Sequence, residues 1–150
     1  MFQQENYNYV SGADEKIKEL LLIAIKDELH DRNFYNQLAK NIDNKEDASI
    51  VRQISMDEQK HYDYLLWIYK KLVGHTPFIR DNKDEQFKIP SSLSKVFASS
   101  IFSELEAVEF YRRLMFMFLD LEVRDMIYEI ITDEQAHATK FNYLYSKYKT

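Results

Sequence analysis

Apolar residues recur at steps of three and four along most of the chain, with polar residues at the positions between them. This spacing places the apolar side chains on one face of an α-helix. The pattern falls into four blocks and predicts four long helices, at about 14–41, 47–73, 91 or 92–119, and 121–147. Residues that commonly cap a helix N-terminus lie at the starts of these blocks: Ser11 or Asp14, Asn44 or Asp47, Ser91, and Asp120.

The segments between the blocks predict the topology, because they differ in length. The links "NIDNKE" and "LDLE" are short, and short links make neighbouring helices antiparallel. The middle segment, 74–90, has 17 residues. When extended it spans ~56 Å, longer than the ~37 Å of a ~25-residue helix, so the chain can return along the whole bundle. The predicted fold is all-α: a ferritin-like four-helix bundle of two helical hairpins joined by a long crossover.

Composition supports one helical domain over 1–150, with 1–12 as a flexible N-terminal arm. Only 2 Gly and 2 Pro are present, too few turn-forming residues for a many-stranded sheet. A net charge of −5 without a basic cluster argues against nucleic acid as a partner. The absence of Cys excludes disulfides and thiolate metal sites, and it fits a cytoplasmic protein. No apolar run approaches the ~18 residues of a membrane span, and the first residues do not resemble a signal peptide, so no membrane association is expected.

Two stretches of the chain repeat one another at an offset of 76 residues. "ISMDEQKHYDYLLWIY" at 54–69 and "IITDEQAHATKFNYLY" at 130–145 both contain Asp-Glu-Gln-x-His. The correspondence extends upstream to the pairs Glu28/Glu104, Leu29/Leu105, Phe34/Phe110, Tyr35/Tyr111 and Leu38/Leu114. The repeat predicts that the two hairpins are alike and that the bundle has a pseudo-two-fold axis.

Six polar residues of the repeat fall on the apolar faces of the predicted helices and therefore point into the bundle: Glu28, Glu58, His61, Glu104, Glu134 and His137. Unpaired buried charges are strongly unfavourable, so four inward carboxylates need neutralisation. Two divalent cations would neutralise them. Carboxylates and imidazoles without sulfur suit iron or manganese, and this arrangement in a four-helix bundle is typical of di-iron carboxylate proteins.

Simpler explanations exist for each of these residues. A single Glu-x-x-His pair on a helix is usually a surface pair, but here two copies lie on apolar faces. Tyr35 and Tyr111 lie seven residues after inward-facing glutamates, so their hydroxyls could bond ligand carboxylates or could simply fill the core. Asp31, three residues after Glu28, is expected to be solvated, as is the acidic run 81–86 of the crossover.

These motifs resemble those of the rubrerythrin and ferritin-like family of di-iron proteins, over about 14–147. The family pattern Glu-x6-Tyr is present as "ELHDRNFY" and "ELEAVEFY", and the family Glu-x-x-His is present twice. The resemblance implies two Fe ions, with Mn as the alternative metal. It also implies the iron ligands Glu28, Glu58, Glu104 and Glu134, with His61 and His137 each capping one iron.

The chain departs from rubrerythrins proper in two ways. It has no cysteine and hence no rubredoxin module, so electrons would come from an external donor protein or from a small molecule. Ala107 stands where rubrerythrins carry an additional Glu, so the six-ligand set resembles the wider superfamily more than the peroxidase branch.

By this resemblance, the expected function is that of an oxidoreductase that reacts with hydrogen peroxide or dioxygen. Tyr35 and Tyr111 are then the candidate catalytic residues, and a homodimer is the expected assembly. A ferroxidase or iron-handling protein without a dedicated substrate is the alternative. A third possibility is a helical interaction protein that docks through the segment 2–10.

The aspartates before the two ligand glutamates have a predicted role of their own. A metal-bound histidine needs an acceptor for its second ring N–H. Because the pseudo-two-fold axis brings the second and fourth helices together, Asp57 is expected to accept from His137 and Asp133 from His61. The alternative is that both aspartates are solvated.

Overall fold

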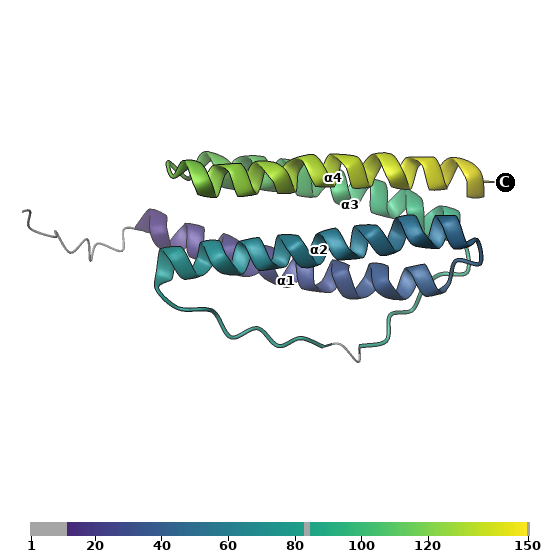
Figure 1. Ribbon diagram of the computed structural model, residues 1–150, viewed down its shortest axis with the longest axis horizontal. Coiled ribbons are helices and arrows are strands. Elements are labelled where there is room, and N and C mark those ends of the chain that lie inside the picture. Colours follow the sequence, from purple (N-terminus) through teal and green to yellow (C-terminus); the bar gives the residue numbers. More distant parts are fainter. Residues whose placement is uncertain (1–11, 83–84, 150) are drawn as a thin grey trace, which may run out of the picture.

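The computed structural model describes residues 12–82 and 85–149, and this part of the chain folds into four helices. They are α1 (Gly12–Lys40), α2 (Lys45–Val73), α3 (Leu93–Phe116) and α4 (Leu121–Tyr148). Figure 1 shows them side by side as two antiparallel hairpins, α1–α2 and α3–α4. The predicted all-α four-helix bundle is confirmed. Among the described helices there is no candidate for a segment that crosses a lipid bilayer.

The helix ends follow the expected capping chemistry at two of the four starts. Asn44 accepts hydrogen bonds from the backbone N–H groups of Glu46 and Asp47, and Asp120 accepts from that of Val123. Two expectations were wrong. The cap position of α3 is Ser92, which makes no capping hydrogen bond with its side chain, instead of Ser91.

The helix α1 also begins earlier than expected. It starts at Gly12, so that Asp14 lies in the first turn instead of capping the helix. Apart from Gly12, the N-terminal arm proposed for 1–12 lies outside the described residues, as does Ser11. Gly74 caps the C-terminus of α2 directly after Val73. It adopts φ = 91°, a left-handed conformation that glycine tolerates without strain.

The crossover runs along the outside of the α1–α2 hairpin, from one end of the bundle to the other (Figure 1). It is bonded to α1 on both sides of its undescribed residues. Arg32 donates from Nη2 to both carboxylate oxygens of Asp81, at 2.8 and 3.0 Å. Gln37 donates to the carbonyl of Glu85 at 2.6 Å and accepts from the backbone N–H of Phe87 at 3.0 Å. Asp81 was expected to be solvated and is instead part of this attachment.

Two groups of apolar side chains form the core. One includes Leu21, Leu65 and Leu114, and the other includes Leu38 and Phe141. The inward-facing Glu and His residues lie between these groups along every helix, so the polar centre is closed at both ends by packed side chains. The apolar faces predicted from the sequence are buried in the bundle. Leu72, near the end of α2, is an exception, because it is 37% exposed.

Candidate metal centre

All six of the predicted ligands are buried at the middle of the bundle. Their exposed fractions are 5% for Glu28, 1% for Glu58, 0% for His61, 3% for Glu104, 2% for Glu134 and 0% for His137. Helical periodicity accounts for this placement, because each residue shares its face with leucine, isoleucine or phenylalanine. Four carboxyl groups in such an interior strongly favour a bound cation.

The six side chains form two overlapping groups. The first group contains Glu28, Glu58, His61 and Glu134, and the second contains Glu58, Glu104, Glu134 and His137. In each group, one ligand atom per residue lies within 4.8 Å of the others. Glu58 and Glu134 belong to both groups. Glu28 and Glu104 each belong to one group.

Both histidines face the carboxylates through Nδ1. His61 Nδ1 lies 2.9 Å from Glu134 Oε1, 3.0 Å from Glu58 Oε2 and 3.5 Å from Glu28 Oε2. The Nδ1 atom of His137 lies 3.3 Å from Glu58 Oε1 and 3.5 Å from Glu104 Oε2. The two rings are 5.8 Å apart between centroids. The outward Nε2 atoms are left for other partners.

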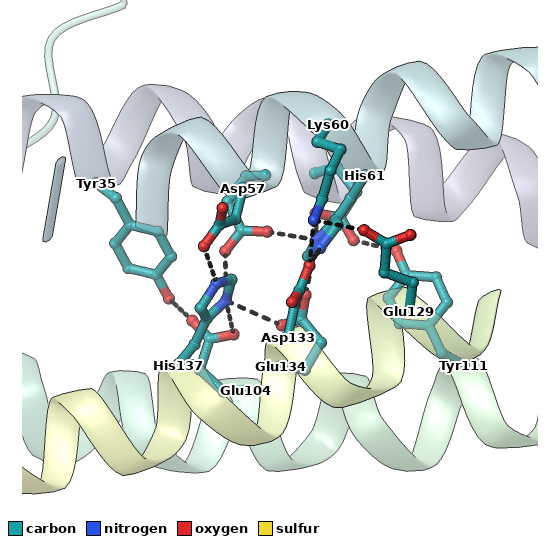
Figure 2. A network of polar contacts seen from close by, with 12 residues as sticks. Tyr35, Asp57, Lys60, His61, Glu104, Tyr111, Glu129, Asp133, Glu134 and His137 are labelled. Atoms are coloured by element: carbon teal, nitrogen blue, oxygen red, sulfur yellow. Dashed lines mark hydrogen bonds and ion pairs between the residues drawn. The ribbon is translucent and has the colours of Figure 1, made fainter. Parts of the chain in front are cut away.

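Those partners are the two aspartates, each from the opposite hairpin. His137 Nε2 lies 3.1 Å from Asp57 Oδ2, and His61 Nε2 lies 3.0 Å from Asp133 Oδ2 (Figure 2). The structure therefore contains both of the crossed pairs that the repeat suggested. Each carboxylate orients an imidazole so that Nδ1 points at the metal position, which is how a ligand histidine is usually supported.

The tyrosines also cross between hairpins. The hydroxyl of Tyr35 donates to Glu104, and the hydroxyl of Tyr111 donates to Glu28. Figure 2 shows the two tyrosines at opposite ends of the cluster. Seven-residue spacing along one helix does not reveal this exchange of partners, because it depends on how α1 and α3 lie against each other. Both tyrosines thereby fix ligand carboxylates.

Burial raises the pKa of the Glu28 carboxyl well above its ordinary value, and the charge of Glu58 raises it further. Burial likewise raises the pKa of the Glu104 carboxyl, with a further contribution from Glu134. Glu134 behaves differently. Burial alone would raise its pKa, but contacts with Glu104, His137 and His61 hold it below its ordinary value. The contacts of Glu134 therefore favour the charged form of its carboxylate.

The histidines are biased toward their charged form by the surrounding carboxylates. Burial alone would lower the pKa of His61, but Asp133 and Glu134 raise it above its ordinary value. The same opposition of burial and carboxylates raises the pKa of His137. On the outer side, the His61 hydrogen bond lowers the pKa of Asp133 to about 2 against the effect of burial, and Lys60 contributes. A cation at Nδ1 would take the place of the histidine proton there.

Hydrogen bonds among the side chains of the centre do not satisfy all of its buried polar atoms, and a metal ion could. Glu134 Oε1 and His137 Nδ1 are fully buried and have no hydrogen-bond partner of suitable geometry among the described residues. Buried polar atoms without such a partner, in a set of carboxylates and imidazoles, are suitable ligand atoms for iron or manganese. These six residues are therefore the ones that would hold a metal.

Sequence reasoning missed one group that supports the centre. Lys60 Nζ lies 2.7 Å from Asp133 Oδ2 and 2.8 Å from Glu129 Oε1, and Tyr64 donates to Glu129 at 2.9 Å. The residue equivalent to Lys60 in the repeat is Ala136, so the repeat gives no indication of the contacts of Lys60. The equivalent aspartate, Asp57, has a more distant lysine: Lys140 Nζ lies 3.9 Å from its Oδ2 atom.

A cavity of about 350 Å³ between α1 and α3 connects the surface with the centre. The buried Glu28, Glu104 and Glu134 line its inner part, while His30 and Glu106 are exposed at its mouth. Asp31 was expected to be solvated; it lines this cavity and bonds through Oδ1 to His30 Nδ1 at 2.9 Å.

The fold and the site define a four-helix-bundle protein with a buried Glu/His cluster able to bind metal ions. The chain belongs to the rubrerythrin family, whose sequence model matches residues 19–145. A solved structure of a hypothetical protein from Pyrococcus furiosus has a similar fold, with a TM-score of 0.75 and 21% identity over 91% of this chain and 92% of that chain. No curated protein matches the sequence.

Proposed function

We propose that the protein is a non-haem di-iron, or di-manganese, oxidoreductase that reacts with hydrogen peroxide or dioxygen and takes electrons from an external donor. The observation that carries the proposal is the pair of overlapping Glu/His groups that share Glu58 and Glu134. Membership of the rubrerythrin family supports it. When bound, two iron ions can supply two electrons to the oxidant, one from each ion.

The side chains of the chain itself would hold this centre rigid and dry. Glu28 and Glu104 each accept a hydrogen bond from a tyrosine hydroxyl, and each histidine is oriented by a contact with an aspartate. Packed apolar side chains close both ends of the centre. Fixed ligands in a water-poor interior are what a redox metal site requires of its protein.

Proton supply follows from the same contacts. Reduction of one peroxide molecule to two water molecules consumes two electrons and two protons. Burial raises the pKa of Tyr111 and of Tyr35 well above the ordinary value, so both hydroxyls keep their protons at neutral pH. Only Tyr111 of the two lines the cavity between α1 and α3. We assign Tyr111 as a proton-holding group on the side where an oxidant would enter, and Tyr35 as its counterpart at the opposite end of the cluster.

The absence of cysteine in the chain bears on the source of the electrons. Without a cysteine-ligated electron-transfer module, the reductant is a separate protein that docks outside the bundle. A homodimer in the cytoplasm is the assembly we propose.

An iron-oxidising and iron-handling protein is the second candidate, because the cavity to the centre is rimmed by Asp27, His30, Asp31 and Glu106, which suit an incoming cation. Storage of iron needs a cage of many subunits. Gel filtration separates the candidates, since a dimer-sized particle disfavours storage.

The test begins with protein purified without oxygen from its native host. We expect metal analysis to find about two iron or manganese ions per chain. Stopped-flow mixing with H₂O₂ and, separately, with O₂ should oxidise the reduced centre, faster with its true oxidant. The Tyr111→Phe variant should slow this step more than Tyr35→Phe, with metal content unchanged. A reduced, fully loaded protein that reacts with neither oxidant would overturn the proposal.

A further inference from the structure

The cavity between α1 and α3 is lined by equivalent positions of the two hairpins, but the residues at those positions differ. At the offset of 76, Asp27 corresponds to Ser103, and Asp31 corresponds to Ala107. All four line the cavity. The α1 wall therefore carries carboxylates where the α3 wall carries a hydroxyl and a methyl group. The metal centre is symmetric in its six ligands and asymmetric in this wall.

Asp31 has the spacing that the centre already uses twice. His61 follows Glu58 by three residues, and His137 follows Glu134 by three residues. In both cases the two side chains reach one group of metal-binding atoms, because residues three apart are neighbours on a helix surface. Asp31 follows Glu28 by the same three residues. Three of the four helices thus carry a metal-binding residue type three positions after a buried glutamate, whereas α3 has Ala107 three positions after Glu104.

The surroundings of Asp31 place it beside the centre and also restrain it. Its side chain is 36% exposed, in the cavity that the buried Glu28, Glu104 and Glu134 also line. Glu134, which belongs to both groups of metal-binding side chains, lines the same cavity. The charges of Glu58 and Glu134 act on Asp31 and, after burial, contribute to raising its pKa. Asp31 is thus electrostatically part of the carboxylate cluster.

His30 holds the Asp31 carboxylate at the cavity wall. Its Nδ1 atom lies 2.9 Å from Asp31 Oδ1, which leaves Oδ2 for another partner. The His30 ring packs edge-on against Phe87 of the crossover, with centroids 5.1 Å apart, and is stacked with Phe34 at 6.3 Å. The crossover therefore helps to position His30. The α3 wall has Glu106 at the position of His30, followed by Ala107, so it offers no comparable pair.

From this geometry we propose that Asp31 is a further carboxylate ligand of the metal centre, with His30 as its positioning residue. The inference rests on the proposed di-metal function. Asp31 would then be the seventh protein ligand of the centre and would serve one of the two ions. The two ions would therefore differ in affinity and coordination number. Because the cavity is the route from the surface, Asp31 is also the first ligand that an entering cation meets.

Co(II) is a suitable probe, because its visible absorption reports coordination number. Protein stripped with a chelator is titrated with Co(II) in the wild type, in Asp31→Asn, and in the control Asp125→Asn, which changes an exposed carboxylate of α4 away from the cavity. We expect two Co(II) ions in all three. In Asp31→Asn one ion should bind more than about 10-fold more weakly, because the loss of a ligand should cost at least as much affinity as the loss of a supporting residue. Its absorption should also show a lower coordination number.

A carboxylate transplanted to the other wall sharpens the test. Asp31→Ala combined with Ala107→Asp should restore at least part of the lost affinity, because position 107 is equivalent by the repeat. Asp31→Asn with wild-type affinities and an unchanged Co(II) spectrum would overturn the role of Asp31 while leaving the di-metal function intact. Wild-type protein that binds no Co(II), Fe(II) or Mn(II) would instead overturn the di-metal function, and this role with it. Circular dichroism of each variant excludes unfolding as the cause.

Discussion

Glu28 on α1 and Glu104 on α3 occupy equivalent places in the two hairpins. Each is buried, each accepts a hydrogen bond from a tyrosine of the other hairpin, and burial raises the pKa of each. Their surroundings differ. The crossover is hydrogen-bonded to α1, and carboxylates line the α1 wall of the cavity. A repeated set of Glu and His side chains can thus have unequal surroundings in its two halves, because the neighbouring residues differ between the halves.

The largest effect should come from the ligands that the two halves share. The Glu58→Gln/Glu134→Gln variant should lose both ions, because these carboxylates belong to both groups. Glu28→Gln should weaken mainly the ion near His61. We expect losses of more than about 100-fold, beyond what supporting residues cause. Isothermal titration with Mn(II) measures this.

The matching control for the shared ligands is Glu46→Gln at an exposed position in the first turn of α2. It should bind metal like the wild type. Two Mn(II) ions bound by the double variant at wild-type affinity would show that the site is misassigned.

The crossed aspartates should give the next largest effect and should separate the halves. Asp57→Asn should loosen the ion at His137, and Asp133→Asn the ion at His61, each by about 10- to 100-fold with the fold retained. The reason is that each carboxylate orients one imidazole through Nε2. Metal titration of both variants, with the exposed Asp63→Asn as control, checks this. Equal weakening of both ions by either variant would contradict a separate role for each aspartate.

Metal-free protein should lose stability as the pH rises from about 5 to 8. The folded pKa values of Glu28, Glu104, His61 and His137 all lie above their ordinary values, so the folded state binds more protons than the unfolded state in this range. Each excess proton corresponds to about 1.4 kcal/mol of lost stability per pH unit. Asp133 and Glu134 act with the opposite sign only at lower pH, because their pKa values are lowered.

Chemical denaturation at several pH values measures this slope in chelator-treated protein. Glu28→Gln and Glu104→Gln should each reduce it by a similar amount, since one residue of the pair lies in each hairpin. Saturating Mn(II) should raise the melting temperature and weaken the pH dependence. Metal-free stability that increases over this range would contradict the assignment.

The attachment of the crossover should have the smallest effect. Arg32 and Asp81 are 16% and 26% exposed in their side chains and form a two-oxygen ion pair, so a double-mutant cycle of Arg32→Gln and Asp81→Asn should give a coupling of about 1–2 kcal/mol. The exposed Arg112–Glu109 pair of α3 is the control, and its coupling should be below about 0.5 kcal/mol. Equal couplings would show that the crossover is not held by this contact.

The sequence by itself determined the residues at the centre of the bundle. Helical periodicity is local, and an apolar stripe states which face of a helix is buried. Glu58 and His61 lie on such a stripe and are buried, and the 76-residue repeat located Glu134 and His137 in the same way. The lengths of the links were enough to predict two hairpins and one long crossover. The crossed pairing of Asp57 and Asp133 also followed, because it needs only the pseudo-two-fold axis.

Contacts between helices were decided by the tertiary structure, because they depend on the rotation and axial shift of each helix against its neighbours. The spacing of Tyr35 from Glu28 did not show that its hydroxyl reaches Glu104 on the opposite hairpin. The ion pair of Lys60 with Asp133 has no counterpart in the repeat. Asp31 was expected to be solvated, but in the structure it lines the cavity between α1 and α3, beside the centre. Periodicity shows which residues point inward, but only the packed bundle shows which of them meet.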